Sequence, residues 1–521
     1  MAVPQKIDPQ SWKQDLAAFR QKTEEFYAGN MDKMAYKGFS GLYGSYAQRG
    51  GKASMLRLRM TAGRVTPEKL AFTADAVRRH QVSRIHFTTC QTIQLHDLQP
   101  DAVFDIMEKA LDAGIVTLGG GGDFPRNVMC SPLAGVEEGE YFDVLPWAEA
   151  AGEYLMHFIK AEKMPRKLKV GFSSTAANVP HATYRDLGFV ARADGKFDVY
   201  SAGGLGNNPR FGVKVAEGIA PEKILYYIKA MWLTFRAYGN YDNRARARTR
   251  YMQDALGGPE AYAAAYNAKL QEVFASGEDL TLTGVASSPL TKAGDGSAAP
   301  ESPRVIAQKQ PGLYAVAWHP VGGQPDPQVF CRVADAVCAM NGAEMRLAPD
   351  ETVYLINLTG SEAARLLELT AADTAASLFE TSVSCIGASI CQVGVRDSQA
   401  LLAACVAAVR EANLPDGALP QIHISGCPSS CGTHQTGMIG FRGAAKVIDR
   451  QPQSAFTLYV GGCDRQGSER MGRELGVVLE KNIPAFLVEL GRIVAASGSN
   501  FAAWYAKDVS EFDRIAVKYL A

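Results

Sequence analysis

Four of the ten cysteines lie in two short stretches of the C-terminal third, with spacings that suit a metal centre. They are Cys385 and Cys391 in SCIGASICQVG, and Cys427 and Cys431 in SGCPSSCGTHQ. A structural zinc site usually has Cys-x2-Cys turns, because both sulfurs must meet one small ion. Wider spacings of five and three, among Gly and Ser residues whose amides can donate to sulfur, favour the larger 4Fe-4S cluster. Zinc is the alternative.

Basic residues form a second group with possible chemistry. They are Arg57 and Arg59 in MLRLRM, Arg126 in DFPRNVMC, and Lys167 and Lys169 in PRKLKVGF. The two lysines have strand spacing, so both ammonium groups should project from one face. Each residue lies beside an apolar run, where a long cation is costly unless something anionic meets it. The pattern therefore indicates an anion-binding site.

A third basic stretch, NRARARTRYM, alternates arginine with small or polar residues at Arg244, Arg246, Arg248 and Arg250. Such a run is most often a solvated surface. Next to Tyr and Met, it can also hold the carboxylates of a cofactor.

Composition narrows the class of protein. The 521 residues contain 54 Lys plus Arg and 54 Asp plus Glu, so nothing in the net charge indicates nucleic acid or an anionic membrane as a partner. The N-terminus resembles neither a signal peptide nor a transit peptide, and we expect a cytoplasmic protein. In a reducing compartment, ten cysteines are not expected to form a disulfide framework. The dispersed ones are expected to be small buried apolar residues: Cys90, Cys130, Cys331, Cys338, Cys405 and Cys463.

The chain contains an internal repeat. TPEKLAFTADAV (66–77) matches DPQVFCRVADAV (326–337), and at the same offset RIHFTTCQTIQLHDL (84–98) falls on EMRLAPDETVYLINL (344–358). Each copy predicts a helix, a hairpin or strand with alternating apolar residues, and a second helix. The order predicts a compact α+β sandwich that occurs twice.

The duplication continues with gaps. Residues 169–192 resemble 423–443, and a glycine pair follows each segment. In this alignment Cys427 and Cys431 stand opposite Thr175 and Val179. Thiols in only one half favour a single site shared at the junction of the halves.

These features together resemble the sirohaem and 4Fe-4S sulfite and nitrite reductases. The resemblance rests on the cysteine pattern, the duplicated halves, TTCQTIQ, PRKLK and GGLGNNPRFG, and runs from about Tyr43 to the end of the second half. It implies an internally duplicated α+β fold, with a ferredoxin-like module and a larger α+β domain in each half. The expected segments are an N-terminal arm and helix (1–50), a first ferredoxin-like half-domain (51–160), a first sirohaem- and anion-binding domain (161–275), a Ser/Ala/Gly/Pro-rich linker (276–304), a second ferredoxin-like half-domain (305–375), and a 4Fe-4S and sirohaem domain (376–521).

The resemblance also implies roles for single residues. The four clustered cysteines would ligate the 4Fe-4S cluster, and Cys431 would bridge it to the sirohaem iron. The residues expected to hold the oxyanion are Arg57, Arg126, Lys167 and Lys169, and those in sirohaem-contacting motifs are Gln91, Gln94, Arg210, Arg248 and Arg250. One position departs from the pattern, because the family commonly has Arg where this chain has Cys90.

The implied activity is the six-electron reduction of sulfite to sulfide. No flavin or nicotinamide fingerprint is present, since GGGGDF (119–124) does not open a helix, so an external donor such as ferredoxin or a flavoprotein is expected. The family's sulfite reductases carry Lys-x-Lys where the nitrite enzymes typically have Lys-x-Asn, and Lys167 and Lys169 match the first kind. Nitrite reduction to ammonia is the alternative. A cluster-containing corrinoid-precursor oxygenase of cobalamin synthesis and a non-catalytic electron carrier are more remote.

Overall fold

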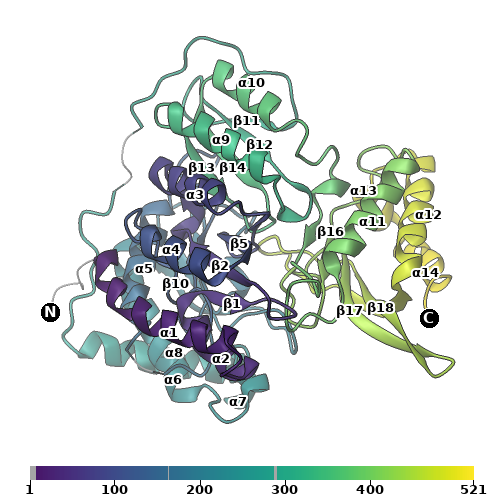
Figure 1. Ribbon diagram of the computed structural model, residues 1–521. Coiled ribbons are helices and arrows are strands. Elements are labelled where there is room, and N and C mark those ends of the chain that lie inside the picture. Colours follow the sequence, from purple (N-terminus) through teal and green to yellow (C-terminus); the bar gives the residue numbers. More distant parts are fainter. Residues whose placement is uncertain (1–6, 162, 287–289) are drawn as a thin grey trace.

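The computed structural model describes residues 7–161, 163–286 and 290–521, and contains two kinds of β-sheet unit, each present twice (Figure 1). The first kind is a ferredoxin-like unit with a small antiparallel sheet. The second kind is a larger unit with a five-stranded mixed sheet. The chain is thus built from two halves with the same order of units.

The two ferredoxin-like units have matching elements. The first contains β2 (Ser54–Arg59), α3 (Pro67–Arg79), β4 (Arg84–Phe87), β5 (Thr92–Leu98) and α4 (Pro100–Ala110). The second contains β12 (Tyr314–Trp318), α9 (Pro327–Ala339), β13 (Glu344–Leu347), β14 (Val353–Leu358) and α10 (Gly360–Leu369). Helices α3 and α9 begin 260 residues apart, as do β4 and β13. Both helices start with proline, which suits the first turn because its missing N–H has no helical partner there.

The two larger units also correspond. The first contains β6 (Met129–Cys130), α5 (Leu145–Met156), β7 (Val170–Ser173), β8 (Leu187–Ala191), β9 (Phe197–Ser201), β10 (Val213–Ile219) and α6 (Ile224–Tyr238). The second contains β15 (Val383–Ser384), α11 (Ser398–Glu411), β16 (Ile422–Ser425), β17 (Ile439–Ile448), β18 (Gln451–Val460), β19 (Arg473–Leu479) and α12 (Ile483–Ala496). In each sheet the first three strands run parallel and the remaining pairs are antiparallel.

Backbone packing repeats between the larger units as well. A Cβ added to Gly188 would lie 1.8 Å from the carbonyl oxygen of Ala182, and one added to Gly440 would lie 1.9 Å from that of His434. Both glycines follow the start of the third strand, so each strand passes the preceding loop at a distance that only glycine allows.

The remaining elements complete these units or connect them. The helices are α1 (Leu16–Tyr27), α2 (Lys33–Ser40), α7 (Tyr251–Ala255), α8 (Pro259–Ala275), α13 (Phe501–Lys507) and α14 (Val509–Val517). The strands are β1 (Ser45–Ala47), β3 (Arg64–Val65) and β11 (Val305–Ala307). Short 3-10 helices are η1 (Pro9–Asp15), η2 (Gly41–Tyr43), η3 (Thr61–Gly63), η4 (Ala182–Tyr184), η5 (Pro221–Lys223), η6 (Arg244–Arg246), η7 (Val321–Gly323), η8 (Phe379–Thr381) and η9 (Glu480–Asn482).

Two of these strands join sheets that the segment boundaries expected from the sequence would not give them. Strand β1 lies in the segment assigned to an N-terminal arm and helix, yet it extends the first sheet, whose order is β1-β2-β5-β4. Strand β3 comes from the first half but pairs with β13, so the second sheet has the order β11-β12-β14-β13-β3. The halves are therefore joined by a shared sheet.

The hydrophobic cores follow the same division. One continuous core lies beneath both ferredoxin-like units, where α3 packs beside α9, and it includes Leu70, Phe87, Trp318 and Phe330. Each larger unit has a core of its own. Figure 1 shows the second larger unit, with α11 to α14, set beside the other three units.

The stretch expected to be a linker has irregular backbone wherever residues 276–304 are described. It is anchored on α10, because Lys292 forms an ion pair with Glu362 at 2.5 Å and Ser361 N donates to Ser297 Oγ at 2.8 Å. Within the described part of the chain, no helix is both long and apolar enough to cross a membrane.

Candidate functional site: a thiol-rich junction beside a basic cluster

The four clustered cysteines lie on two loops of the second larger unit. Cys385 and Cys391 follow β15, and Cys427 and Cys431 lie between β16 and β17. Strands β15 and β16 are neighbours and run parallel, so the loops after them leave from the same edge of the sheet. Cys385 N also donates to Ile424 O at 3.2 Å, which joins the start of one loop to the strand before the other.

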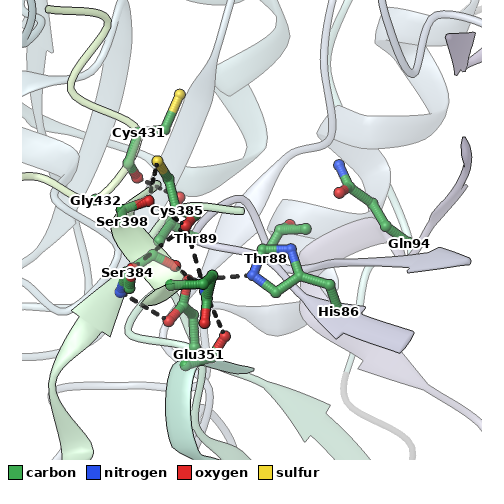
Figure 2. Close-up of polar contacts among 12 residues, drawn as sticks. His86, Thr88, Thr89, Gln94, Glu351, Ser384, Cys385, Ser398, Cys431 and Gly432 are labelled. Carbon is green, nitrogen blue, oxygen red and sulfur yellow. Dashed lines mark hydrogen bonds and ion pairs between the residues drawn. The ribbon is translucent and has the colours of Figure 1, made fainter. Parts of the chain in front are cut away.

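The thiols influence one another. Cys385 Sγ accepts a hydrogen bond from Gly426 N at 3.2 Å and lies 3.2 Å from Ser398 Oγ. Burial and the nearby Cys431 raise the pKa of Cys385 to about 12. Desolvation raises the pKa of Cys431 too; Cys427 and Cys391 add to the rise, while Lys167 and Lys169 oppose it. Figure 2 shows the Cys385 and Cys431 sulfurs in one region.

The first half of the chain holds these loops in place. Thr89 Oγ1, in the TTCQTIQ stretch, donates to Cys431 O at 2.8 Å (Figure 2). Arg49 Nη2 donates to Cys391 O at 3.2 Å and to Gly394 O at 2.7 Å. Gly206, in the GGLGNNPRFG loop, exchanges two hydrogen bonds with the Gln435 side chain, at 2.8 and 2.9 Å. The cysteine loops therefore lie at the junction of the halves, where the asymmetric distribution of cysteines predicted a site.

Glu351 is a buried carboxylate at this junction that the sequence did not single out. Its Oε2 accepts from Ser384 N, the residue before Cys385, at 3.1 Å, and its Oε1 lies 3.4 Å from His86 Nε2 (Figure 2). Burial raises the pKa of Glu351. The residue has a positive φ of 72° in the turn between β13 and β14, which places its side chain between the halves. The sequence signal for this residue was the adjacent pair Asp350 and Glu351 in APDET, but such a pair is typical of an ordinary turn.

Arg57 and Arg126 converge on one backbone group. Arg57 Nη1 donates to Gly120 O, and Arg126 Nη1 donates to the same oxygen at 2.6 Å. Arg57 also faces Gln94 on the neighbouring strand, whose amide oxygen, in the orientation that satisfies its neighbours, accepts from Arg57 Nε at 3.1 Å. Gln94 thus positions a residue of the basic cluster.

Arg59 lies deeper and supports the same loop. It donates to Leu118 O, Pro125 O and Arg126 O, at 3.1 to 3.3 Å. Burial, with Arg126 and Arg57 nearby, lowers the pKa of Arg59 to about 9. Burial also lowers the pKa of Arg126 to about 10, and Arg57 contributes to that shift.

The GGGGDF stretch is the loop that wraps these arginines. A Cβ on Gly120 would lie 2.7 Å from Thr117 O, and one on Gly121 would lie 2.5 Å from Gly41 O and from Tyr46 Oη. The consecutive glycines therefore allow a close approach of backbone to backbone, and their carbonyls reach the guanidinium groups.

The two lysines come from a segment that pairs with this loop. Leu168 forms a parallel bridge with Pro125, and Arg126 N donates to Leu168 O at 2.8 Å, so Lys167 and Lys169 flank the point where the loop and the segment meet. Desolvation lowers the pKa of Lys167 well below its ordinary value, and the cations Arg248, Lys169 and Arg126 lower it further. Lys169 N donates to the buried carboxylate of Asp186 at 2.7 Å.

Cys90 lies in this basic cluster and is not the buried apolar residue that the sequence predicted. It is half-buried, and Lys169 Nζ lies 3.1 Å from its sulfur. Burial opposes ionisation, but Lys169, Arg185 and Arg57 outweigh it and lower the pKa of Cys90 to about 6. The surrounding cations thus favour the thiolate form of Cys90.

Two of the expected sirohaem-contacting arginines lie close to this cluster. Arg248 Nη2 pairs with Asp186 at 3.0 Å, and its Nε is buried without a hydrogen-bond partner. Arg250 is 5% exposed; its Nε donates to Asn207 O at 2.8 Å, while its Nη1 is buried without a partner. A Cβ on Gly204 would lie 3.5 Å from Arg250 Nη1, so the glycine loop brings its backbone up to that group.

Arg210 and Gln91 make other contacts. Arg210 is exposed and pairs with Asp254 at 3.0 Å. The Gln91 side chain is buried and joins the halves, because it donates to Cys130 O and to Leu347 O, at 2.8 and 2.6 Å, and accepts from Cys130 N at 2.9 Å. A cofactor contact by either residue stays a prediction.

The donor set fits the two groups that the sequence led us to expect. Four thiols on adjacent loops suit a cluster with several iron corners. Within the described residues, no three His, Cys, Asp or Glu side chains gather tightly enough to hold a single metal ion. Beside the thiols, buried nitrogens of Arg126, Arg248 and Arg250 lack protein acceptors, which is the environment that a polycarboxylate macrocycle and a small anion would satisfy.

Two protein-family models match segments of the first half of the chain. Residues 46–113 match the nitrite/sulfite reductase ferredoxin-like half domain, and residues 121–273 match the nitrite and sulphite reductase 4Fe-4S domain. An assimilatory ferredoxin-dependent nitrite reductase of Haloferax mediterranei is 25% identical over 87% of this chain and 83% of its own length. A ferredoxin–nitrite reductase of Synechococcus elongatus is 27% identical over 78% of this chain and 80% of its own. A ferredoxin sulfite reductase of Mycolicibacterium paratuberculosis is 24% identical over 87% of this chain and 80% of its own length.

Among solved structures, the NirA protein of Mycobacterium tuberculosis has the same fold, with a TM-score of 0.76, 21% identity and 97% of each chain covered. The duplicated α+β architecture predicted from the repeat is therefore confirmed. The family is characterised by a 4Fe-4S cluster and a sirohaem, which are the cofactors of this oxidoreductase. The chain is thus similar to the nitrite and sulfite reductases over most of its length.

Proposed function

We propose that this protein reduces sulfite to sulfide with six electrons, and that Cys385, Cys391, Cys427 and Cys431 would hold the cluster, with Cys431 shared between the cluster and the sirohaem. The observation that carries the substrate proposal is the basic cluster of Arg57, Arg126, Lys167 and Lys169 beside Cys431. A second lysine next to Lys167 favours a doubly charged anion over a singly charged one. When bound, a cluster and a sirohaem would supply the electron-transfer chemistry that this reduction needs.

The residues of the chain have separate tasks in this proposal. Arg57 and Arg126, both fixed on Gly120 O, bind the oxyanion and stabilise the charge added to it. Lys167, whose pKa is lowered, gives up a proton from Nζ more readily than an ordinary lysine, which suits a general acid. Arg248 and Arg250, with their unpartnered nitrogens, would hold carboxylates of the sirohaem.

Nitrite reduction to ammonia is the second candidate. Its support is that the relatives from Haloferax and Synechococcus are named as nitrite reductases, while the relative from Mycolicibacterium is named as a sulfite reductase. The same cations would bind either anion. We further infer a cytoplasmic location, where the thiols of the six dispersed cysteines stay reduced, and ferredoxin as the electron donor, as in the names of these relatives.

Electron counting tests the reaction. Under anaerobic conditions, the purified holoenzyme should oxidise about six equivalents of reduced methyl viologen for each sulfide formed from sulfite, because sulfite differs from sulfide by that number of electrons. Reduced ferredoxin should replace the viologen. If the enzyme turns over nitrite but forms no sulfide from sulfite, the substrate proposal is contradicted. If a reduced flavoprotein sustains turnover and reduced ferredoxin does not, the donor assignment is contradicted.

A further inference from the structure

Cys90 is held so that its sulfur meets a lysine of the basic cluster. Its backbone is fixed on both sides, because Cys90 N donates to Thr88 Oγ1 at 3.3 Å and Asn127 Nδ2 donates to Cys90 O at 3.1 Å. Its sulfur lies 3.1 Å from Lys169 Nζ. The thiol is half-buried, so it is neither a core residue nor a freely solvated one.

The other charges near Cys90 come from three further segments. Arg57 is on β2, Arg126 is in the loop that ends the glycine run, and Arg185 follows η4. Arg185 is fixed by Pro180 O, which accepts from its Nε at 2.9 Å, and by His181 Nδ1 at 3.2 Å. Four cations around one sulfur stabilise the ionised form of the thiol.

We propose that Cys90 is a specificity-determining residue of the anion site, where its thiolate pairs with Lys169 and cancels part of the positive charge that Lys169 offers to substrate. This inference deepens the proposed function and rests on it, since it assumes that the basic cluster binds the oxyanion. Each unit of charge in the site acts twice as strongly on sulfite dianion as on nitrite. Cys90 therefore limits the preference of the site for sulfite and keeps nitrite as a usable substrate.

Two substitutions separate charge from packing. Cys90→Ser removes the negative charge with little change of volume, and Cys90→Asp keeps a negative charge beside Lys169. At pH 8, where the thiolate and sulfite are both ionised, Cys90→Ser should raise the ratio of kcat/KM for sulfite to kcat/KM for nitrite about ten-fold. Cys90→Asp should keep the wild-type ratio within about three-fold. Cys463→Ser, at another half-buried thiol, is the matched control and should leave the ratio unchanged.

A ratio that Cys90→Ser leaves unchanged would overturn the inference. So would a Cys90→Asp variant that shifts the ratio as far as Cys90→Ser, because packing rather than charge would then be responsible. The proposed function is judged separately, on the wild-type enzyme: a wild type that prefers nitrite contradicts the sulfite assignment, whereas the effect of the two substitutions on the ratio still tests the role of Cys90.

Thiol alkylation gives a readout that does not depend on turnover. In the holoenzyme, the rate at which iodoacetamide modifies Cys90, followed by mass spectrometry of its peptide, should rise with pH around a midpoint near 6, and sulfite should slow the reaction. A midpoint at the ordinary thiol value of about 8.5 would overturn the inference. Failure of Cys90 to react at any pH up to about 9, while Cys463 reacts, would overturn it as well.

Discussion

At the scale of single residues, Lys169 links the groups that determine how much charge the site carries. Its backbone N–H is bound to Asp186, its ammonium group contacts Cys90, and its charge lowers the pKa of Lys167. Burial makes these interactions stronger than they would be on the surface. The two lysines therefore do not act as independent cations, and a change at one alters the other.

Replacing Lys169 with asparagine tests its part in substrate choice. Lys169→Asn removes a cation and leaves the Cys90 thiolate without its partner, so the kcat/KM for sulfite should fall at least about ten-fold relative to that for nitrite. The measurement is steady-state turnover of both anions with reduced viologen. Lys196→Asn, at an exposed lysine in the β8–β9 turn, should change neither value. An unchanged ratio in Lys169→Asn would show that this lysine does not select the anion.

At the scale of elements, the glycine run is the part of the fold that brings the arginines together. The Gly120 carbonyl can bind both guanidinium groups only because the loop lies directly against Thr117 and Gly44. The lysine segment then pairs with the end of this loop through Leu168 and Pro125. The geometry of the anion site thus depends on how closely two stretches of backbone approach.

Gly120→Ala should widen this approach. The added Cβ would lie 2.7 Å from Thr117 O, so the loop must shift; we expect a loss of about 1–3 kcal/mol in the free energy of unfolding and a higher KM for sulfite. Gly38→Ala is the control, since nothing lies within 4 Å of its Cβ and alanine favours the helix there. Equal stability and equal KM in the two variants would disprove the role of the loop.

Asp186 is the second support at this scale. It is fully buried and accepts from Lys169 N, Arg248 Nη2 and Thr249 Oγ1. Asp186→Asn leaves the partly buried guanidinium group of Arg248 without its counter-charge and should cost about 2–4 kcal/mol, together with loss of sirohaem per chain. Denaturant unfolding and the absorbance of the bound haem measure the two effects. Asp194→Asn, at an exposed carboxylate, should change neither, and full haem content in Asp186→Asn would contradict the assignment.

At the scale of the whole molecule, the two halves are joined through a strand and an ion pair as well as through the site. Strand β3 of the first half pairs with β13, and Arg64 on β3 binds Glu344 on β13 through Nε, at 2.9 Å. Burial opposes ionisation of Glu344, but Arg346 and Arg64 outweigh it and lower its pKa. We expect the halves to unfold together rather than one after the other.

The pH dependence of stability tests this connection. A carboxylate with a lowered folded-state pKa stabilises the protein above its unfolded value of 4.5, and the contribution is lost as the pH falls through the folded-state pKa. Wild type should therefore be more stable than Glu344→Gln at pH 6, and the difference should shrink as urea unfolding is repeated at pH 5, 4 and 3. A difference that stays constant over this range would contradict the account.

Much of this architecture was predictable from the sequence, because duplication leaves a signal that does not depend on knowing any contact. The offset between 66–77 and 326–337 is the offset between α3 and α9 in the structure. The contacts of Cys90 with Lys169 and of Glu351 with Ser384 join residues far apart in the chain. Such contacts follow from how the loops pack. The sequence marks Cys90 only as a departure from the family's Arg, without indicating its partner, and the acidic pair at Glu351 is typical of an ordinary turn.

The choice between the two anions remains the most direct test of the account. We would measure kcat/KM for sulfite and for nitrite on one anaerobic preparation with full sirohaem and iron content, using reduced viologen as donor. The account predicts a higher value for sulfite, with sulfide as the product, because Lys167 and Lys169 both lie near Cys431 and add two positive charges there. A higher value for nitrite would contradict the substrate assignment built on the two lysines.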